Sequence, residues 1–371
     1  MNVEPRDILI VSRIPGVGPT RLRSLFTGFG SAARLSAAPQ CALRRIEGID
    51  GKTAASIGSF FRSGAADAAA RFADDQQARC ERAGAHPLTL WAPSYPPSLR
   101  NIFDPPPLLF VRGSILDEDT RSVAVVGTRR PSPYGLLMAE RFAASLGALG
   151  LTVVSGLARG IDSAAHAASV RSGNRTLAVI GSGIDVIYPS ENRGLAGRIS
   201  ACGALITELP FGAKPDAANF PRRNRIVAGM SLATLVIETA PGGGAMITAG
   251  IALEQGREVF AVPSAVSSNS RSGTNLLIKE GKAKLTETVD DIFVELAPRL
   301  SSPGRPPARK AEPDVTLFER TLLDALGDDP LHIDALASAA HMTPSDALVH
   351  LLSLEFKGAV RQIPGKRFLR L

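Results

Sequence analysis

The chain has 371 residues, of which 44% are hydrophobic and 21% are charged. This length allows two or three domains with sizeable cores, and the composition excludes an intrinsically disordered chain. The formal net charge of +7 favours an anionic partner, such as nucleic acid or a phosphorylated ligand, over an acidic membrane, because no basic amphipathic helix stands out. On charge alone, a basic but inert surface is an equally open interpretation.

The cysteines indicate a reducing environment. Cys41, Cys80 and Cys202 lie far apart, their number is odd, and none forms a CxxC or Cys/His pair with the spacing of metal ligands. We therefore expect reduced thiols, a cytoplasmic location and no metal site. The first residues lack an apolar run long enough for a signal peptide, and no later run reaches transmembrane length, so membrane insertion is not expected.

Residues 1–90 are expected to form a small helical domain that contains two similar hairpins. The stretches IPGVGPTRL (14–22) and IEGIDGKTA (46–54) each turn at a glycine just before a helix start. Both resemble helix-hairpin-helix motifs, in which backbone N–H groups at a helix N-terminus hold a phosphate. In the second hairpin, Asp50 replaces the expected glycine and would repel phosphate. A compact helical domain whose glycines simply turn the chain is equally open.

Residues 91–297 are predicted to form a Rossmann-like core. The core begins with an aromatic and proline-rich stretch, 91–113, that suits an extended strap. Six continuous apolar runs follow and alternate with helical segments: VAVVG, LTVVS, TLAVIG, GALITE, ATLVIET and EVFAVP. Continuous runs are typical of parallel strands buried on both faces, and strand–helix alternation implies right-handed crossovers. We therefore expect an α/β fold with a doubly wound parallel sheet.

Two further segments follow the core. Residues 298–313 are polar, proline-rich and basic, which is the composition of a linker. Residues 314–371 show three stretches of helical periodicity and end in VRQIPGKRFLRL, the pattern of a hairpin with a Pro-Gly turn. Three helices and a β-hairpin predict a winged-helix domain. Because this segment holds more acidic than basic residues, an interaction or dimerisation role is as open as DNA binding.

Ligand binding is expected at one edge of the sheet. In doubly wound sheets ligands bind outside the carboxyl ends of the strands, and the unusual segments of this chain all follow strands. Arginine forks and exposed backbone N–H groups suit phosphate oxygens, and a phenylalanine offers a stacking face for a base. The candidate binding residues are Gly127, Arg129, Ser155, Gly156, Arg159, Phe220, Arg222, Arg223, Asn224, Arg225, Gly243 and Arg271.

Catalytic residues are not predicted. A triad of Ser155, Asp162 and His166 is disfavoured because SGLARG lacks the GxSxG pattern of a nucleophile elbow. Asp162 and His166 are four residues apart and fit a pair on one helix surface, and Asn224 and Arg225 also fit loop-bracing roles. Neither paired carboxylates nor a metal cluster converge on the edge. The sequence therefore favours a site that holds a ligand over one that breaks it, and it predicts no cofactor.

Six motifs in order over residues 105–285 closely resemble the DprA/Smf family of DNA-processing proteins: PPLLFVRG, VAVVGTRRPSPYG, SGLARGIDSAAH, AVIGSGIDVIYPSEN, FPRRNRIVAGMS and GGGAMITAGIALEQGREVFAVP. The flanking segments agree with a sterile-alpha-motif-like or hairpin N-terminal domain and a winged-helix C-terminal domain. The resemblance implies binding and protection of single-stranded DNA, loading of RecA recombinase in natural transformation and recombination, a homodimer through the core, and no enzymatic activity. It implies that the single strand contacts Arg129, then Ser155, Gly156 and Arg159 of SGLARG, and the segment from Phe220 to Arg225.

An enzyme is the alternative. The stretch PGGGAMITAG (241–250) is similar to the PGGxGT loop of LOG-like nucleoside-monophosphate phosphoribohydrolases, which share this type of sheet. In that family a catalytic glutamate follows the loop directly, whereas here the next acidic residue is Glu254. Hydrolysis of nucleoside monophosphates is therefore the second hypothesis for the same edge of the sheet.

Overall fold

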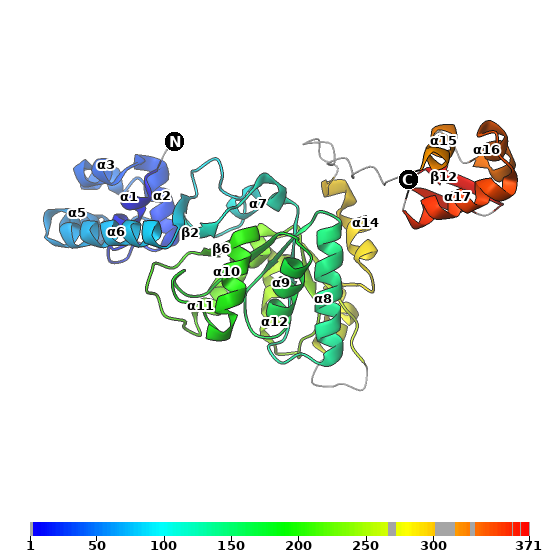
Figure 1. Ribbon diagram of the computed structural model, residues 1–371. Coiled ribbons are helices and arrows are strands. Elements are labelled where there is room, and N and C mark those ends of the chain that lie inside the picture. The colour runs from blue at the N-terminus through cyan, green and yellow to red at the C-terminus, as the bar shows by residue number, and fades with distance from the viewer. Residues whose placement is uncertain are drawn as a thin grey trace. The chain divides into compact units, whose positions relative to one another are not determined.

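The computed structural model describes residues 3–265, 272–300, 316–326, 331–357, 359–363 and 365–370. The chain divides into two compact units, Met1–Leu300 and Ser301–Leu371, and each is described by itself. The first unit holds a group of helices and a large sheet, and the second is a small helical unit with a three-stranded sheet (Figure 1). The boundary at residue 90 between a helical domain and the core stays a prediction.

The sheet of the first unit has nine strands in the order β1-β2-β6-β5-β4-β3-β7-β8-β9. The apolar runs of the sequence form β3 (Ser122–Val126), β4 (Thr152–Ser155), β5 (Thr176–Val179), β6 (Ala204–Thr207), β7 (Ala233–Val236) and β8 (Glu258–Ala261). These strands pair in parallel, as do β8 and β9 (Lys284–Leu285). β1 (Ala85–Thr89) and β2 (Leu108–Gly113) extend the β6 edge in antiparallel fashion. The predicted doubly wound parallel core is confirmed, with its change of direction between β3 and β7.

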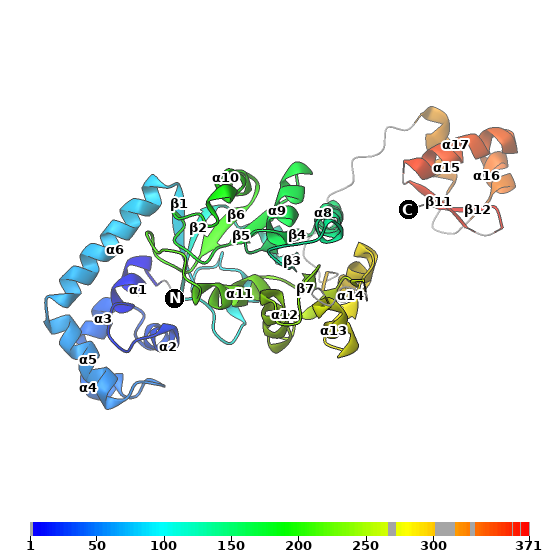
Figure 2. The same ribbon diagram turned by 90° about the horizontal axis from the view of Figure 1, so that it is seen from below.

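Helices cover both faces of this sheet. Figure 2 shows α8 (Pro133–Ala148), α9 (Ile161–Arg171) and α10 (Arg193–Cys202) on one face, with α11 (Asn219–Met230) and α12 (Gly244–Glu254) on the other. Within β3, Val123 and Val125 join the core that includes α8 and α9, whereas Ala124 and Val126 join the core that includes α11 and α12. Burial on both sides explains the unbroken apolar runs in the sequence. Two helices, α13 (Gly273–Lys279) and α14 (Val289–Leu300), flank β9 in the chain.

The N-terminal helices contain the two predicted hairpins, between α1 and α2 and between α4 and α5. Their turning glycines, Gly16 and Gly48, have φ values of 83° and 79°, which favour glycine. Arg21 links the hairpins, because its side chain donates to the carbonyl oxygen of Gly16 at 2.7 Å and of Gly48 at 2.9 Å. The helices are α1 (Pro5–Val11), α2 (Pro19–Phe29), α3 (Ala32–Ala37), α4 (Gln40–Leu43), α5 (Gly51–Arg62) and α6 (Ala65–Arg82).

Asp50 has a structural role in the second hairpin. It is the N-cap of α5, and its carboxylate accepts a hydrogen bond from the backbone N–H of Thr53 at 2.7 Å. An aspartate at this position therefore satisfies a backbone donor that a glycine would leave to another partner. This bond, with smaller contributions from Arg21 and Lys52, holds the pKa of Asp50 below its usual value.

The stretch 91–113 is less extended than the sequence suggests. It contains the short helix α7 (Pro97–Arg100) and strand β2. Tyr95 is fully buried there, and its hydroxyl donates to the carbonyl oxygen of Pro106 at 2.9 Å. A buried phenol needs such an acceptor. Two short 3₁₀ helices, η1 (Asp117–Thr120) and η2 (Ser190–Asn192), complete the first unit.

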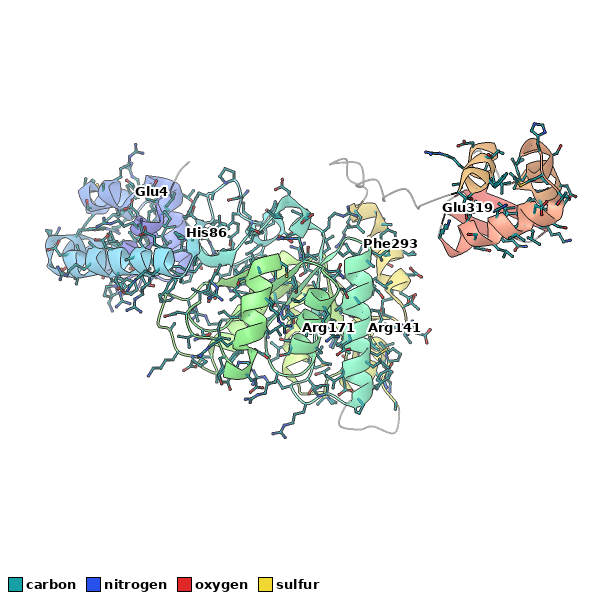
Figure 3. All side chains as sticks on the ribbon, viewed as in Figure 1. Glu4, His86, Arg141, Arg171, Phe293 and Glu319 are labelled. Carbon is teal, nitrogen blue, oxygen red and sulfur yellow. The ribbon has the colours of Figure 1, made fainter. Side chains whose placement is uncertain are left out.

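The second unit has the predicted winged-helix composition. It contains α15 (Leu317–Ala325), β10 (Leu331–His332), α16 (Ile333–Ala339), α17 (Pro344–Phe356), β11 (Val360–Ile363) and β12 (Arg367–Arg370). Thr343 caps α17 by accepting from the N–H of Asp346 at 3.2 Å. Glu319, labelled in Figure 3, is buried and accepts from the ammonium group of Lys357 at 2.8 Å. Of the expected linker, residues 298–300 end α14, and residues 301–313 lie outside the described residues.

None of the helices in the described ranges is both long enough and apolar enough to cross a bilayer.

Candidate nucleic-acid interface

A pocket of about 780 Å³ lies at the carboxyl ends of β3 and β7, where the strand order reverses. Segments that follow β3, β4, β5, β6 and β7 all contribute to its wall. We call it the switch-point pocket. Its lining includes Gly127, Thr128, Arg129, Arg130, Gly156, Ala158, Asp162, Tyr188, Phe220, Arg223, Asn224, Gly243 and Thr248. The structure thus brings seven of the predicted binding residues to one place; Arg271 lies outside the described residues.

The FPRRNR stretch forms part of a helix, so its side chains point to different neighbours. The sequence suggests a loop, but these residues are the first turns of α11. Phe220, Arg223 and Asn224 recur at helical spacing and line the pocket. Arg222 lines a different hollow. Arg225 pairs with Glu208 and with Asp104, at 3.6 Å from the latter, so it braces α11 against its neighbours.

Arg129 and Phe220 form a stack inside the pocket. The guanidinium carbon of Arg129 lies 5.1 Å from the centre of the Phe220 ring. The ring of Tyr188 lies 5.9 Å from the same ring, at 44° to it. Phe220 also packs against Gly181, since a Cβ built there would lie 3.2 Å from the ring. The pocket thus carries planar groups of the kind on which nucleic-acid bases stack.

Beneath the stack, Arg223 holds the SGLARG loop. Its buried guanidinium donates to the carbonyl oxygens of Gly156 and Val179. Asp162 accepts from the N–H of the same Gly156 at 3.2 Å, so both sides of this residue's backbone are held. Burial lowers the pKa of Arg223 to about 10 and raises the pKa of Asp162, while the opposite charge of each partner works against both shifts. Arg223 therefore stays protonated at neutral pH.

The side chains of two other predicted residues in the SGLARG stretch are held by other groups. Ser155 is fully buried, and its hydroxyl donates to the carbonyl oxygen of Val125 at 2.6 Å. Arg159 is exposed, forms a two-point ion pair with Glu191 at 2.7 and 2.9 Å, and lies beside the pocket with Tyr188. The ion pair raises the pKa of Arg159. Direct ligand contact by either residue stays a prediction.

Asp162 and His166 are not a pair on a helix surface, because both are buried. The Thr176 hydroxyl donates to the carbonyl oxygen of Val153, so it accepts from Nδ1 of His166 at 2.7 Å. Nδ1 of His166 is thus engaged by Thr176, and the Ser155 hydroxyl is engaged by the carbonyl oxygen of Val125. Burial, with a smaller effect of the charge on Arg223, lowers the pKa of His166 to about 3.

This buried histidine predicts a pH dependence of stability. An unfolded histidine titrates near 6.5. Between pH 6.5 and about 3 the unfolded chain therefore binds more protons than the folded chain. The free energy of unfolding should fall as the pH falls through this window, by up to ~1.4 kcal/mol per pH unit from this group.

The measurement is urea unfolding of the wild type and of His166→Asn at several pH values between 7 and 4. Asparagine keeps a donor for Thr176 but does not titrate. We expect the difference in stability between the two proteins to narrow as the pH falls. Parallel pH profiles would contradict the assignment of a neutral buried imidazole.

Glu238 occupies the helix terminus where Rossmann-type folds hold a pyrophosphate. This buried carboxylate follows β7 and accepts from the N–H and the hydroxyl of Ser132, the N-cap of α8. A Cβ at Gly135, in the first turn of α8, would lie 2.7 Å from a carboxylate oxygen of Glu238. A free phosphate at this terminus would meet a negative charge already in place. The lack of further glycines in the turn after Gly127 is therefore consistent with a turn that holds no dinucleotide.

Gly243, at the start of α12, also lines the pocket. It is the N-cap of α12, and a Cβ there would lie 2.4 Å from the Thr239 hydroxyl oxygen, so the loop closes tightly. Glu254 is the last residue of the same 11-residue helix. At about 1.5 Å per residue it lies roughly 15 Å from the glycine loop. The acid that follows the loop in the sequence is therefore remote from it.

Sequence reasoning missed the roles of Tyr188, which lines this pocket, and of Glu238, which binds Ser132 at the start of α8. Tyr188 follows β5 in the stretch IDVIYPSEN, and its aromatic ring was the available clue. Glu238 is an acid directly after a buried apolar strand, which points to a carboxylate with a specific partner. Among the described residues, no group of three or more His, Cys, Asp or Glu side chains is arranged to hold a metal ion.

Two family models and several known proteins match this chain. The family model described as DNA recombination-mediator protein A matches residues 86–297, and that of the DprA winged helix domain matches residues 306–366. The Smf protein of Synechocystis sp. is 32% identical over 410 aligned positions, which cover 100% of this chain and 99% of that protein. The Smf protein of Escherichia coli is 38% identical over 276 positions, covering 73% of this chain and 74% of that protein.

Two solved structures are also similar. DNA processing protein A (DprA) of Streptococcus pneumoniae has a TM-score of 0.66 and 31% identity, and the match covers 80% of this chain and 99% of that one. DNA processing protein A of Helicobacter pylori, whose structure addresses its single-stranded DNA binding mode, has a TM-score of 0.53 and 27% identity, with 58% and 96% covered. Because the family model matches more than half of the chain and the Synechocystis relative aligns along all of it, the chain belongs to the family of DNA recombination-mediator protein A, the DprA proteins.

Proposed function

We propose that this chain binds single-stranded DNA in the switch-point pocket, with little preference for sequence. A role in DNA processing follows from its family membership, and the H. pylori relative is described by its single-stranded DNA binding mode. On this chain, Arg129 and the backbone at the start of α12 would receive phosphates. Phe220 would stack on a base.

One observation carries the proposal: Glu238 fills the anion position at the start of α8, while Arg129, in the same turn, stacks inside the pocket. A dinucleotide needs the first position for its pyrophosphate. A polynucleotide does not, because its phosphates are spread along a backbone that Arg129 reaches from the side. A cation and an aromatic ring together are the usual features of a groove that binds single-stranded nucleic acid.

Replacing Phe220 with alanine tests the stacking role. Loss of one stacked base costs about 1–3 kcal/mol of binding free energy, so the dissociation constant for oligothymidylate should rise about 5- to 150-fold. Phe220→Tyr should keep most of the affinity, because it keeps the ring. Fluorescence anisotropy with a labelled oligonucleotide measures both. Equal weakening by the two substitutions would exclude a stacked base on Phe220.

We also propose that the pocket binds without catalysis. The groups that would serve a hydrolase are engaged or remote: Ser155 donates to a backbone carbonyl, Asp162 holds the Gly156 amide, and Glu254 ends α12. The discriminating experiment is incubation with nucleoside monophosphates. Release of free base above a protein-free blank would support the phosphoribohydrolase alternative in place of a binding protein.

Finally, we propose that the chain protects the strand and loads RecA on it as a homodimer, as the family resemblance implies. The sheet ends at the short strand β9, and the nearby side chains of Leu285, Phe293 and Val294 are 45%, 37% and 69% exposed. Figure 3 labels Phe293 on α14. Exposed apolar groups beside a sheet edge are a feature of interfaces. Val294→Asp should convert a dimer to a monomer in sedimentation, and a monomeric wild type would overturn this part.

A further inference from the structure

A second hollow of about 280 Å³ lies between the N-terminal helices and the end of the sheet. We call it the hairpin hollow, because residues of the first hairpin form one of its walls. Its lining residues are Ile8, Leu9, Ser12, Arg13, Val17, Gly18, Pro19, Leu22, Phe72, Pro107, Leu108, Phe110, Glu208, Leu209, Pro210 and Arg222. Ligand pockets measure about 300–1,000 Å³, so this one is slightly smaller than that range and suits a single planar group.

The chemistry of the hollow combines apolar walls with two cations. Leucine, isoleucine, valine, phenylalanine and proline side chains make up most of the lining. Arg13 lies over the ring of Phe72 at 5.0 Å, and Arg222 is exposed. Neither guanidinium forms an ion pair within the part of the chain that the structure describes. The acid of the lining, Glu208, is already paired with Arg225.

The hairpin hollow and the switch-point pocket share a helix. Phe220, Pro221 and Arg223 of α11 line the pocket, and Arg222, within the same turn, lines the hollow. A strand that leaves the pocket across the start of α11 therefore meets Arg222 next. Its negative backbone would then lie beside both cations of the hollow and release counterions there.

We propose that the hairpin hollow is a second nucleotide subsite for the same single strand, with a base in the apolar hollow and the adjoining phosphates on Arg13 and Arg222. The proposal rests on the proposed function of the switch-point pocket. It gives the N-terminal helices a direct part in binding. It also explains why α11 presents cations on two of its faces: Arg223 serves the first subsite and Arg222 the second.

The experiment measures the affinity of the full chain for oligothymidylates of increasing length. Short oligonucleotides fill the switch-point pocket alone, and longer ones also reach the hollow. The double variant Arg13→Ala/Arg222→Ala should bind the shortest ligands as the wild type does. It should lose the additional affinity of the longer ligands, about 5- to 150-fold for one stacked base. Its salt dependence with long ligands should be reduced, by about 0.7 in log–log slope per lost phosphate contact.

Two further variants separate this role from a general effect of charge. Arg34→Ala/Arg62→Ala removes the same charge from exposed positions of the N-terminal helices that do not line the hollow. It should bind ligands of all lengths within about 2-fold of the wild type, since isolated surface charges contribute little. Leu209→Trp narrows the hollow without changing charge, and it should reproduce the length-dependent loss. Thermal melting checks that each variant is folded.

Four outcomes are decisive. A loss confined to longer oligonucleotides supports the subsite. Wild-type affinity at every length for both the arginine double variant and Leu209→Trp overturns it and leaves the switch-point pocket unaffected. An equal loss at every length also overturns it, because both arginines would then act on the first site. If the wild type binds no oligonucleotide at all, the proposed function itself fails.

Discussion

Replacing Arg223 with alanine is expected to lower the free energy of unfolding by about 3–5 kcal/mol, the range seen when a buried charge loses the opposite charge that compensates it. Arg223 is only 6% exposed, and its guanidinium donates to the carbonyl oxygens of Gly156 and Val179. Without it, two acceptors lose a donor and the buried carboxylate of Asp162 loses its nearby positive charge. Chemical denaturation monitored by circular dichroism measures the change.

The same substitution should weaken single-stranded DNA binding by about 2–4 kcal/mol, which is the range of interface hot spots and about 30- to 1,000-fold in the dissociation constant. Two effects contribute: the pocket loses a cation, and the SGLARG loop loses the group that positions it. Gly156→Ala should act in the same direction, because a Cβ there would lie 2.4 Å from the Arg223 guanidinium.

A double-mutant cycle tests this explanation. Asp162→Asn removes the opposite charge while keeping an oxygen acceptor for the Gly156 N–H. If the two buried charges compensate each other, Arg223→Ala should cost less stability in the Asp162→Asn background than in the wild type. Strict additivity of the two substitutions would show that Asp162 and Arg223 act independently. In that case the loss in Arg223→Ala would come from its two carbonyl acceptors alone.

The sequence predicts the structure best where the same local pattern of residues recurs along the chain. Six apolar runs predict β3 to β8, because strands buried on both faces carry mostly apolar side chains. The rule that ligands bind at the carboxyl ends of such strands then locates the pocket without coordinates. It brings the turn that contains Gly127 and Arg129 together with Gly243, which is far from that turn in the chain. The winged helix is predictable for a similar reason, since Thr343 and Pro344 are local start signals for a helix.

What the sequence cannot resolve is the direction of each side chain. Arg222, Arg223 and Arg225 look equivalent in FPRRNR, but α11 turns about 100° per residue and sends them to different neighbours. His166 looks like a surface residue until Thr176 of β5 is placed beside it. Glu238 acquires its role only when β7 lies next to β3, so that its carboxylate reaches the start of α8. Each of these facts depends on contacts between distant segments.

Replacing Arg129 with alanine is expected to weaken single-stranded DNA binding by about 1–3 kcal/mol without a comparable loss of stability. Unlike Arg223, Arg129 is exposed, and its described contact is the stack on Phe220 at 5.1 Å. Removing it therefore leaves no buried group of the described residues without a partner. The midpoint of thermal unfolding should stay close to that of the wild type, while the dissociation constant for oligothymidylate rises about 5- to 150-fold.

The dependence of binding on salt shows which part of Arg129 matters. If the guanidinium contacts one phosphate, Arg129→Ala should reduce the slope of log affinity against log salt concentration by about 0.7. Arg129→Lys keeps the charge but loses the planar group that stacks on Phe220. It should therefore keep the slope of the wild type and lose part of the affinity. Equal slopes in all three proteins would mean that Arg129 holds a base, not a phosphate.

Arg141 supplies the matched control for this prediction. It is an exposed arginine of α8, labelled in Figure 3, and it is absent from the lining of the pocket. Arg141→Ala changes the net charge as Arg129→Ala does, so any effect of overall charge on a polyanion appears in both. Wild-type affinity in Arg129→Ala, or equal losses in the two variants, would remove the switch-point pocket as the binding site. A loss confined to Arg129→Ala shows that the single-stranded DNA binds at the turn after β3. It then contacts the part of this turn that Glu238 does not occupy.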